Sequence, residues 1–309
     1  MHEGSRKAII AAFLANLGIA ISKLVAWFFT GAASMLAESI HSFADTGNQG
    51  LLMLGSKRAR RAPDASHPFG YGAARFFWAF IVALVLFSVG GLFAIYEGID
   101  KLRHPHALES PTWAIAVLVF AIGLESFSLR TAVRATRPLL HGRSYWQFIR
   151  RTKNPELPVV LLEDIGALLG LVFALAGVTT AHVTENARWD AAGSLAIGIL
   201  LVVIAGILAV EMSSLLIGES ADPLEIEAMT AQIVAAPAVV RVIHLRTVQQ
   251  GPDEVVVAAK LEFRPGLDVA ALATAIDDVE GRIRAVVPTA RLIFIEPDLY
   301  RGQPADEID

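Results

Sequence analysis

The sequence predicts an α-helical membrane protein with six transmembrane helices, followed by a small cytoplasmic α+β domain. Of the 309 residues, 54% are hydrophobic and only 18% are charged, whereas soluble domains carry about a quarter charged residues. The part before residue 219 contains six apolar runs, each near the roughly 20 residues that a helix needs to cross a bilayer. The part after it is acidic and patterned for strands as well as helices. This composition excludes an ordinary soluble enzyme.

The six apolar runs define the expected transmembrane domain, residues 1–218. The first run continues past any small-residue cleavage site, so we expect a retained helix, the alternative being a cleaved leader. The expected helices occupy residues 7–29, 34–55, 76–98, 111–133, 158–181 and 191–216.

The distribution of Lys and Arg predicts the orientation of the chain. These residues gather at the N-terminus and in the loops after the second and fourth helices, and they are scarce in the opposite loops. Cytoplasmic loops of membrane proteins carry such an excess, so both termini should face the cytoplasm. We expect an integral multi-pass protein of a bacterial inner (plasma) membrane.

The residues from 219 onward predict a separate domain. Turn residues separate a helix at 223–235, strands at 239–248 and 254–263, a helix at 268–286 and a strand at 290–296. The αββαβ order predicts a ferredoxin- or metallochaperone-like domain over 219–300, followed by a disordered tail at 301–309. The helices lie on one side of so small a sheet, and its other face would be exposed to solvent. A second copy of the domain would cover that face. The segment holds 8 Lys and Arg against 16 Asp and Glu, which does not favour nucleic-acid binding.

Missing residue types restrict the chemistry further. The chain has no cysteine, so any metal must be held by oxygen and imidazole ligands. No G-x-x-x-x-G-K-[ST] loop occurs, so no ATP site is expected. Coupling to protons is the alternative energy source, because imidazole and carboxylate groups lose protons when they bind metal. We therefore expect no resident cofactor, and H⁺ as the counter-ion of any metal that moves through the site.

Ionisable residues inside the expected spans are the candidate metal ligands, because charges at membrane depth are costly and mark function. His41 and Asp45 lie four residues apart in the second span, which places them on one helical face. Glu38, one turn earlier, is either an entrance carboxylate or an interfacial charge. Imidazole with carboxylate suits Zn²⁺, Mn²⁺, Fe²⁺ or Co²⁺, with Zn²⁺ the leading candidate.

The fourth and fifth spans supply further carboxylates. Glu163 and Asp164 are adjacent and point about 100° apart, so we expect only one of them to share a site squarely with the second span. The other should face an aqueous cavity, a neighbouring helix or the basic loop. Glu125 in the fourth span is either a ligand or a protonated carboxyl group between helices. Asn16 and Asn48 are expected to support ligands or helix packing rather than to bind metal.

Two stretches resemble a known family. "TGAASMLAESIHSFADTGNQ" and "HPFGYGAARFFWAFIVALVLFSVGGLFAIYEGIDKL" are similar to the cation diffusion facilitators, which export divalent metals in exchange for protons. "ESIHSFADTGNQ" and "LLEDIGALLGL" most resemble the branch that contains the mitochondrial zinc transporter of animals. The resemblance covers nearly the whole chain and implies a homodimer with one transport site in each subunit.

The resemblance also implies a ligand set and an accessory site. His41, Asp45 and Asp164 match the family's transport ligands, but Val160 stands where a His is usual. Glu163, Glu125 or water would then supply the fourth ligand. The first cytoplasmic loop keeps two residues of an accessory metal site but not the second His, so this site should be weak or absent and its glycines and arginine should shape the loop. The residues concerned are Asp64, His67, Gly70, Tyr71, Gly72 and Arg75.

Three classes of function remain open from the sequence. The leading one is a proton-coupled exporter of Zn²⁺, or of Mn²⁺, Fe²⁺ or Co²⁺, and not an enzyme. An intramembrane metallo-hydrolase would need a motif such as H-E-x-x-H, which is absent. A membrane metal sensor or a structural dimer without transport is the third. The tail should dimerise without metal, since the expected ligand positions hold Lys260 and Ile295, and His244 is its one histidine.

Overall fold

The computed structural model describes residues 17–29, 31, 33–105, 110–140 and 142–301. Two compact units divide the chain. The first comprises the chain up to Lys57, together with Phe77–Arg150 and Asn154–Ser213; the second comprises Arg58–Phe76, Arg151–Lys153 and Ser214–Asp309. Two loops that interrupt the helical part therefore belong to the same unit as the tail. Of the expected disordered tail at 301–309, all but Arg301 lies outside the described residues.

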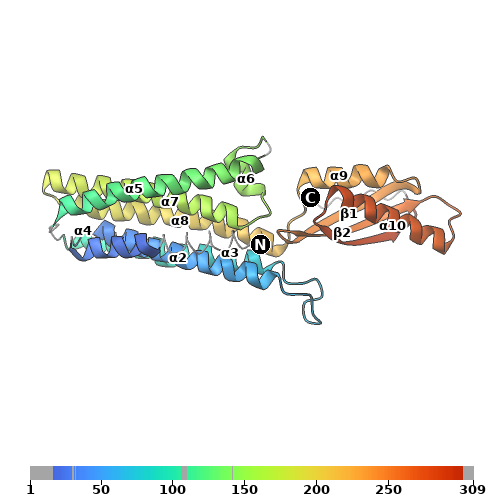
Figure 1. Cartoon of the computed structure of the whole chain (residues 1–309), viewed down its shortest axis with the longest axis horizontal. Helices are drawn as coiled ribbons and strands as arrows, with labels where there is room; N and C mark the ends of the chain where they lie inside the picture. The colour runs from blue at the N-terminus through green and yellow to red at the C-terminus, as the bar shows by residue number, and fades with distance from the viewer. Residues whose placement is uncertain (1–16, 30, 32, 106–109, 141, 302–309) are drawn as a thin grey trace. The chain divides into compact units, whose positions relative to one another are not determined.

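Long helices dominate the first unit and lie side by side (Figure 1). A helix at Leu17–Phe29 precedes them. The others are α2 (Ala33–Ala59), α3 (Ala74–Val85), the π-helix η1 (Leu86–Leu92), α4 (Phe93–Arg103), α5 (Pro111–Thr136), the 3₁₀ turn η2 (Arg137–Leu139), α6 (Tyr145–Arg151), α7 (Glu156–Thr184) and α8 (Arg188–Ile217).

Four helical stretches of the described chain are long and apolar enough to cross a membrane: Ala74–Arg103, Pro111–Leu139, Glu156–Thr184 and Arg188–Ile217. They correspond to the third to sixth expected spans. The first expected span is described only as the shorter helix Leu17–Phe29. Helix α2 has the length, but its polar residues lower its hydropathy. The fold is thus a helical membrane-type domain, and the count of six spans stays a prediction.

Glycines allow the helices to approach closely, as in other membrane bundles. A Cβ atom on Gly98 would lie 2.8 Å from the Leu195 Cγ atom, and one on Gly198 would lie 2.6 Å from the Ile95 Cγ1 atom. These contacts pack α4 against α8. Gly91, inside the π-helix that interrupts the third expected span, likewise faces α8, since a Cβ atom there would lie 2.8 Å from the Val202 Cγ2 atom.

The tail of the second unit follows the expected order of elements. It consists of α9 (Pro223–Val234), β1 (Val239–Gly251), β2 (Glu254–Phe263), α10 (Val269–Val286) and β3 (Ala290–Pro297). Strand β2 is central, antiparallel to β1 and parallel to β3. Alternate β2 residues such as Val257 and Leu261 are buried in one core with Met229 of α9 and Val279 of α10. The small α+β domain therefore has three strands and two helices around one apolar core.

Candidate cation site within the helix bundle

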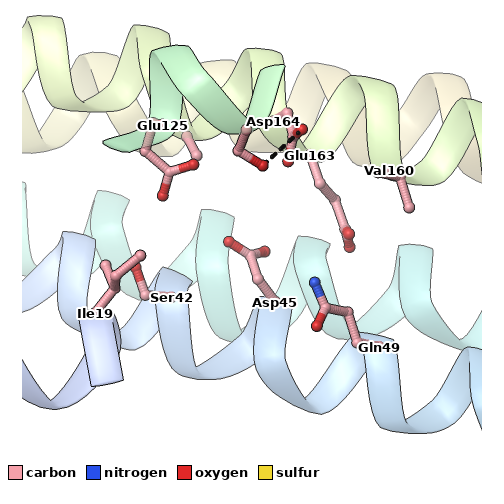
Figure 2. A pocket seen from close by; sticks show the side chains of 10 residues that line it. Ile19, Ser42, Asp45, Gln49, Glu125, Val160, Glu163 and Asp164 are labelled. Atoms are coloured by element: carbon pink, nitrogen blue, oxygen red, sulfur yellow. Dashed lines mark hydrogen bonds between the residues drawn. The ribbon is translucent and has the colours of Figure 1, made fainter. Parts of the chain in front are cut away.

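A small cavity lies among the helices of the first unit, between the helix Leu17–Phe29, α2, α5 and α7. Its volume is about 30 Å³, enough for a water molecule or an ion. Figure 2 shows acidic side chains pointing into it from opposite walls. The lining residues are Ile19, Ser42, Asp45, Gln49, Glu125, Ser128, Val160, Glu163, Asp164 and Ala167.

Helix α2 supplies one wall. Asp45 lies near the middle of this helix, is half-buried, and points toward α7 (Figure 2). Ser42 lines the cavity one turn earlier. His41 lies four residues before Asp45 in the same helix, but its side chain is outside the described part of the chain, as is that of Glu38. Asn16 lies outside it altogether.

Glu163 is the most deeply buried acidic residue of the cavity, with 5% of its surface exposed. The Nδ2 atom of Asn48 in α2 donates a hydrogen bond to its Oε1 atom over 2.7 Å. Asn48 is itself fully buried and does not line the cavity. It therefore contacts a candidate ligand and fixes α7 against α2, which is how a residue that supports a ligand acts.

Asp164 also lines the cavity but has a different partner. The Oγ atom of Ser128 in α5 donates a hydrogen bond to the Asp164 Oδ2 atom over 3.2 Å, drawn dashed in Figure 2. The spacing along α7 predicts that only one of Glu163 and Asp164 shares a site squarely with the second span. Both line the cavity, but Glu163 is hydrogen-bonded to α2 and Asp164 is hydrogen-bonded to α5.

Glu125 projects from α5 into the same cavity and is half-buried. Its carboxyl group lies within electrostatic range of Asp164 and of Lys23. Lys23 is 1% exposed, and its ammonium group donates a hydrogen bond to the Ser42 Oγ atom over 2.8 Å. The cavity is thus lined by four acidic side chains, and the ammonium group of Lys23 is hydrogen-bonded to Ser42 in its wall.

Lys23 and the small polar residues that line the cavity, Ser42, Gln49 and Ser128, are not among the residues that the sequence indicated. The signal for Lys23 was present, since it is a lone charge within the apolar run "ANLGIAISKLVAWFF", and charges in such runs mark function. Val160, where the resemblance implies a His, does line the cavity, but its apolar side chain offers no ligand atom.

The described side chains do not form a closed metal shell. Among them, no group of three or more His, Asp or Glu side chains lies close enough together to hold an ion. Asp45 and Glu125 project from different walls, while Glu163 and Asp164 are held by Asn48 and Ser128. The carboxylates would have to move toward one another to grip a cation.

The loop after α2 contains the two residues expected at an accessory metal site, Asp64 and His67. The Asp64 carboxylate accepts hydrogen bonds from the Ser66 hydroxyl (2.6 Å) and the Tyr71 hydroxyl (2.7 Å) and pairs with Arg61 (3.3 Å). The Ser66 and Tyr71 hydroxyls hold the pKa of this carboxyl group well below its usual range. The His67 ring stacks on Tyr71 with centroids 4.2 Å apart. The Asp64 carboxylate thus uses its lone pairs to hold a turn together, and a metal ion would need those same lone pairs.

The end of this loop packs on the turn between β1 and β2. Arg75 pairs with Asp253 over 3.0 Å. A Cβ atom on Gly72 would lie 2.9 Å from the carbonyl oxygen of Gln250 and the same distance from a Glu254 carboxylate oxygen. Gly72 and Arg75 therefore shape the loop, as the sequence suggested.

Replacing Gly72 with Ala should destabilise this contact, because the Gln250 backbone cannot yield easily. We expect the free energy of unfolding to fall by about 1–3 kcal/mol, measured by thermal unfolding of the full chain. Gly281→Ala is the matched control: it lies within α10 with open space around its Cβ position, so it should be neutral or stabilising by about 1 kcal/mol. Equal effects of the two substitutions would contradict this packing.

The tail carboxylates near the expected ligand position are paired with a cation. Lys260 in β2 lies 3.1 Å from a Glu296 oxygen and 3.2 Å from an Asp298 oxygen. Hydrogen bonds to these two carboxylates raise the pKa of Lys260. A backbone hydrogen bond from Leu299 and the bond from Lys260 lower the pKa of Asp298. A divalent ion would have to displace a lysine here.

We therefore predict that calorimetry of the fragment 219–309 detects no tight Zn²⁺ binding, and that ultracentrifugation finds a dimer with and without metal. Lys260→Ala is the control, because it releases Glu296 and Asp298 from their ion pairs with the lysine. Zn²⁺ binding to this variant should still be weak, because no imidazole completes the site. A micromolar or tighter site in the unaltered fragment would contradict the prediction and make the tail a metal sensor.

Comparison with known proteins identifies the family. The profile of the cation efflux transmembrane domain matches residues 9–217. The proton-coupled zinc antiporter SLC30A9, mitochondrial, is 34% identical in Xenopus laevis and 32% in Homo sapiens over 263 residues, 84% of this chain and 47% and 46% of those proteins. The chain thus spans about half the length of these relatives. The cation-efflux pump FieF of Cronobacter sakazakii is 27% identical over 312 aligned positions, 97% of this chain and 96% of that one. The chain is therefore a membrane protein of the cation efflux (cation diffusion facilitator) family, in the branch of the SLC30A9 relatives.

Proposed function

We propose that the protein is a proton-coupled antiporter that exports divalent metal cations, with Zn²⁺ as its main cargo. The observation that carries the proposal is the cavity lined by Asp45, Glu125, Glu163 and Asp164. Clustered carboxylates inside an apolar bundle are expensive to maintain, and a divalent cation is the ligand that offsets their charge. The family and the names of the relatives support the same activity.

Asp45 and Asp164 are the proposed transport ligands, together with His41. The fourth position, left open by Val160, falls to Glu163, to Glu125 or to water. Glu125 is the better protein candidate, because the Glu163 carboxylate is already engaged by Asn48. An oxygen-rich set with one imidazole accepts Zn²⁺ and also Mn²⁺, Fe²⁺ and Co²⁺, so these ions are the alternative cargo.

Protons are the proposed counter-ions. The imidazole and the carboxylates bind metal only in their deprotonated forms, so loading the site releases protons and protonation expels the metal. In the proposed cycle the cavity opens alternately to the two sides of the membrane. The working unit is a homodimer with one site in each subunit and with both termini in the cytoplasm.

Uptake by proteoliposomes under an imposed pH gradient tests the proposal. We expect Zn²⁺ to accumulate only when the gradient is present, with a counterflow of protons reported by an enclosed pH dye. Liposomes without protein and liposomes with dissipated gradient are the controls. Zinc binding without transport would instead favour a membrane metal sensor, and a panel of Zn²⁺, Mn²⁺, Fe²⁺ and Co²⁺ in the same assay identifies the cargo.

His41 should set the choice among these ions. Replacing it with Asp exchanges the imidazole for a harder oxygen ligand, so discrimination between Zn²⁺ and Mn²⁺ should fall. The pH at which metal and proton compete should also fall, because the unperturbed pKa of imidazole lies near 6.5 and that of a carboxylate lies lower. The metal panel run at several pH values measures both effects. An unchanged ranking of metals would remove His41 from the ligand set.

A further inference from the structure

A lysine is buried in the middle of the helix Leu17–Phe29. Lys23 is 1% exposed, although an ammonium group inside a membrane helix is costly and usually reaches for the interface. Burial of a charge is tolerated only where opposite charge and hydrogen bonds compensate it. The groups that compensate Lys23 therefore indicate what it does.

The described groups around Lys23 belong to the cation cavity. Ile19, four residues before Lys23 on the same helical face, lines the cavity. The Lys23 ammonium donates to the Oγ atom of Ser42 over 2.8 Å, and Ser42 lines the cavity one turn before Asp45. Figure 2 shows Glu125 pointing across toward Ile19 and Ser42. The charge of Lys23 acts on the Glu125 carboxylate.

We propose that Lys23 is a built-in counter-ion of the cation site, which pairs with the Glu125 end of the cavity when no metal is bound and thereby limits how tightly a divalent cation is held. The inference rests on the proposed function, because it assumes that a metal enters this cavity. Lys23 would thus tune affinity without being a ligand.

The charge balance gives the reason for such a residue. Four acidic side chains can carry more negative charge than one divalent ion balances, and the affinity of oxygen sites rises with the number of ligand charges. A transport site must bind strongly enough to load and weakly enough to release. A fixed ammonium group beside the carboxylates offsets one negative charge and competes with the incoming metal.

This role and a purely structural role predict effects of opposite sign. If Lys23 only ties the first described helix to α2 through Ser42, its removal loosens the bundle and weakens metal binding. If it is a counter-ion, removal of its charge leaves the site more negative, so metal binds more tightly and leaves more slowly. Lys23→Gln separates the two, because the amide can still donate to Ser42 but carries no charge.

The experiment titrates the full-length protein in nanodiscs with Zn²⁺ and measures the dissociation constant and the rate of zinc release to a chelator. We expect Lys23→Gln to tighten binding by about tenfold and to slow release, with Lys23→Met giving the same direction. Lys23→Arg keeps the charge and should bind zinc like the wild type. Lys101→Met is the matched control: Lys101 is also buried, at 7% exposure, but contacts the Gly31 carbonyl oxygen and does not line the cavity.

The results separate failure of the inference from failure of the proposed function. No zinc binding by the wild type would refute the proposed function and this inference with it. Normal zinc binding by the wild type, with Lys23→Gln folded by size-exclusion chromatography and binding equally or more weakly, would overturn the inference alone. Tightening by Lys101→Met as well as by Lys23→Gln would also overturn it, because the effect would then not be local to the cavity.

Discussion

Replacing Asp45 with Asn should abolish zinc transport and leave a folded protein. Asn has nearly the shape of Asp, so the packing of α2 should survive. It lacks the negative charge, and charge supplies most of the free energy with which oxygen ligands hold a divalent ion in a low-dielectric site. Asp45 points from the middle of α2 into the cavity, opposite the acidic residues of α7 (Figure 2). No other described α2 carboxylate lines that cavity.

The measurement is the initial rate of Zn²⁺ uptake by proteoliposomes under a pH gradient, where we expect a loss of at least about a hundredfold. Asp100→Asn is the matched control. It makes the same chemical change in the same unit, but Asp100 lies in α4 with about half of its side chain exposed and does not line the cavity. Transport at the wild-type rate in Asp45→Asn would show that the ion follows another route.

Asp164→Asn should abolish transport, whereas Glu163→Gln should reduce it only in part. The Asp164 carboxylate makes a long 3.2 Å hydrogen bond to a neutral hydroxyl, so it can turn to a metal at little cost. Glu163 is 5% exposed and accepts a 2.7 Å bond from Asn48. A Gln side chain can still accept that bond through its carbonyl oxygen, so the link between α2 and α7 survives.

Zinc affinity and uptake rate of the two variants check this difference. Asn48→Ala is the companion variant: it leaves the Glu163 carboxylate buried without its donor, which should cost about 1–3 kcal/mol of stability while both acidic residues remain. Equal and mild losses in Asp164→Asn and Glu163→Gln would mean that α7 does not ligate the metal.

The tail was the most predictable part of the fold. Expected and observed elements agree to within a few residues, because Gly251-Pro252 and Pro265-Gly266 break the chain between periodic segments. Strand β1 runs three residues further than expected, to Gly251, since the antiparallel ladder continues to the turn and ends at the Gly251–Glu254 pair. The boundaries of these helices and strands are therefore set by local sequence.

The first unit was predictable in outline only. Hydropathy located the apolar helices, but it cannot show that the third stretch contains a π-helix at Leu86–Leu92. It also passes over Lys23, because one charge barely lowers the average of a long apolar run. In the second unit, the contact of Gly72 with Gln250 likewise joins residues far apart in the chain, and no local pattern reports it.

The candidate site was found by composition and completed by geometry. Acidic residues in apolar helices indicated Asp45, Glu125, Glu163 and Asp164, and all four line one cavity. Helical spacing predicted that Glu163 and Asp164 point in different directions, and they are hydrogen-bonded to α2 and α5 respectively, but it could not show that one cavity between those helices takes both. The donors to those acids, Asn48 and Ser128, come from other helices, so their roles required the packed structure.

The position of bound zinc tests the central claim most directly. Crystals of the full-length protein grown with Zn²⁺ give an anomalous difference map at the zinc absorption edge. We predict one strong peak per subunit inside the bundle, between Asp45 of α2 and Asp164 of α7, and no such peak in Asp45→Asn. Strong peaks only in the Asp64 loop or on the tail, with an empty cavity, would contradict the assignment of the transport site.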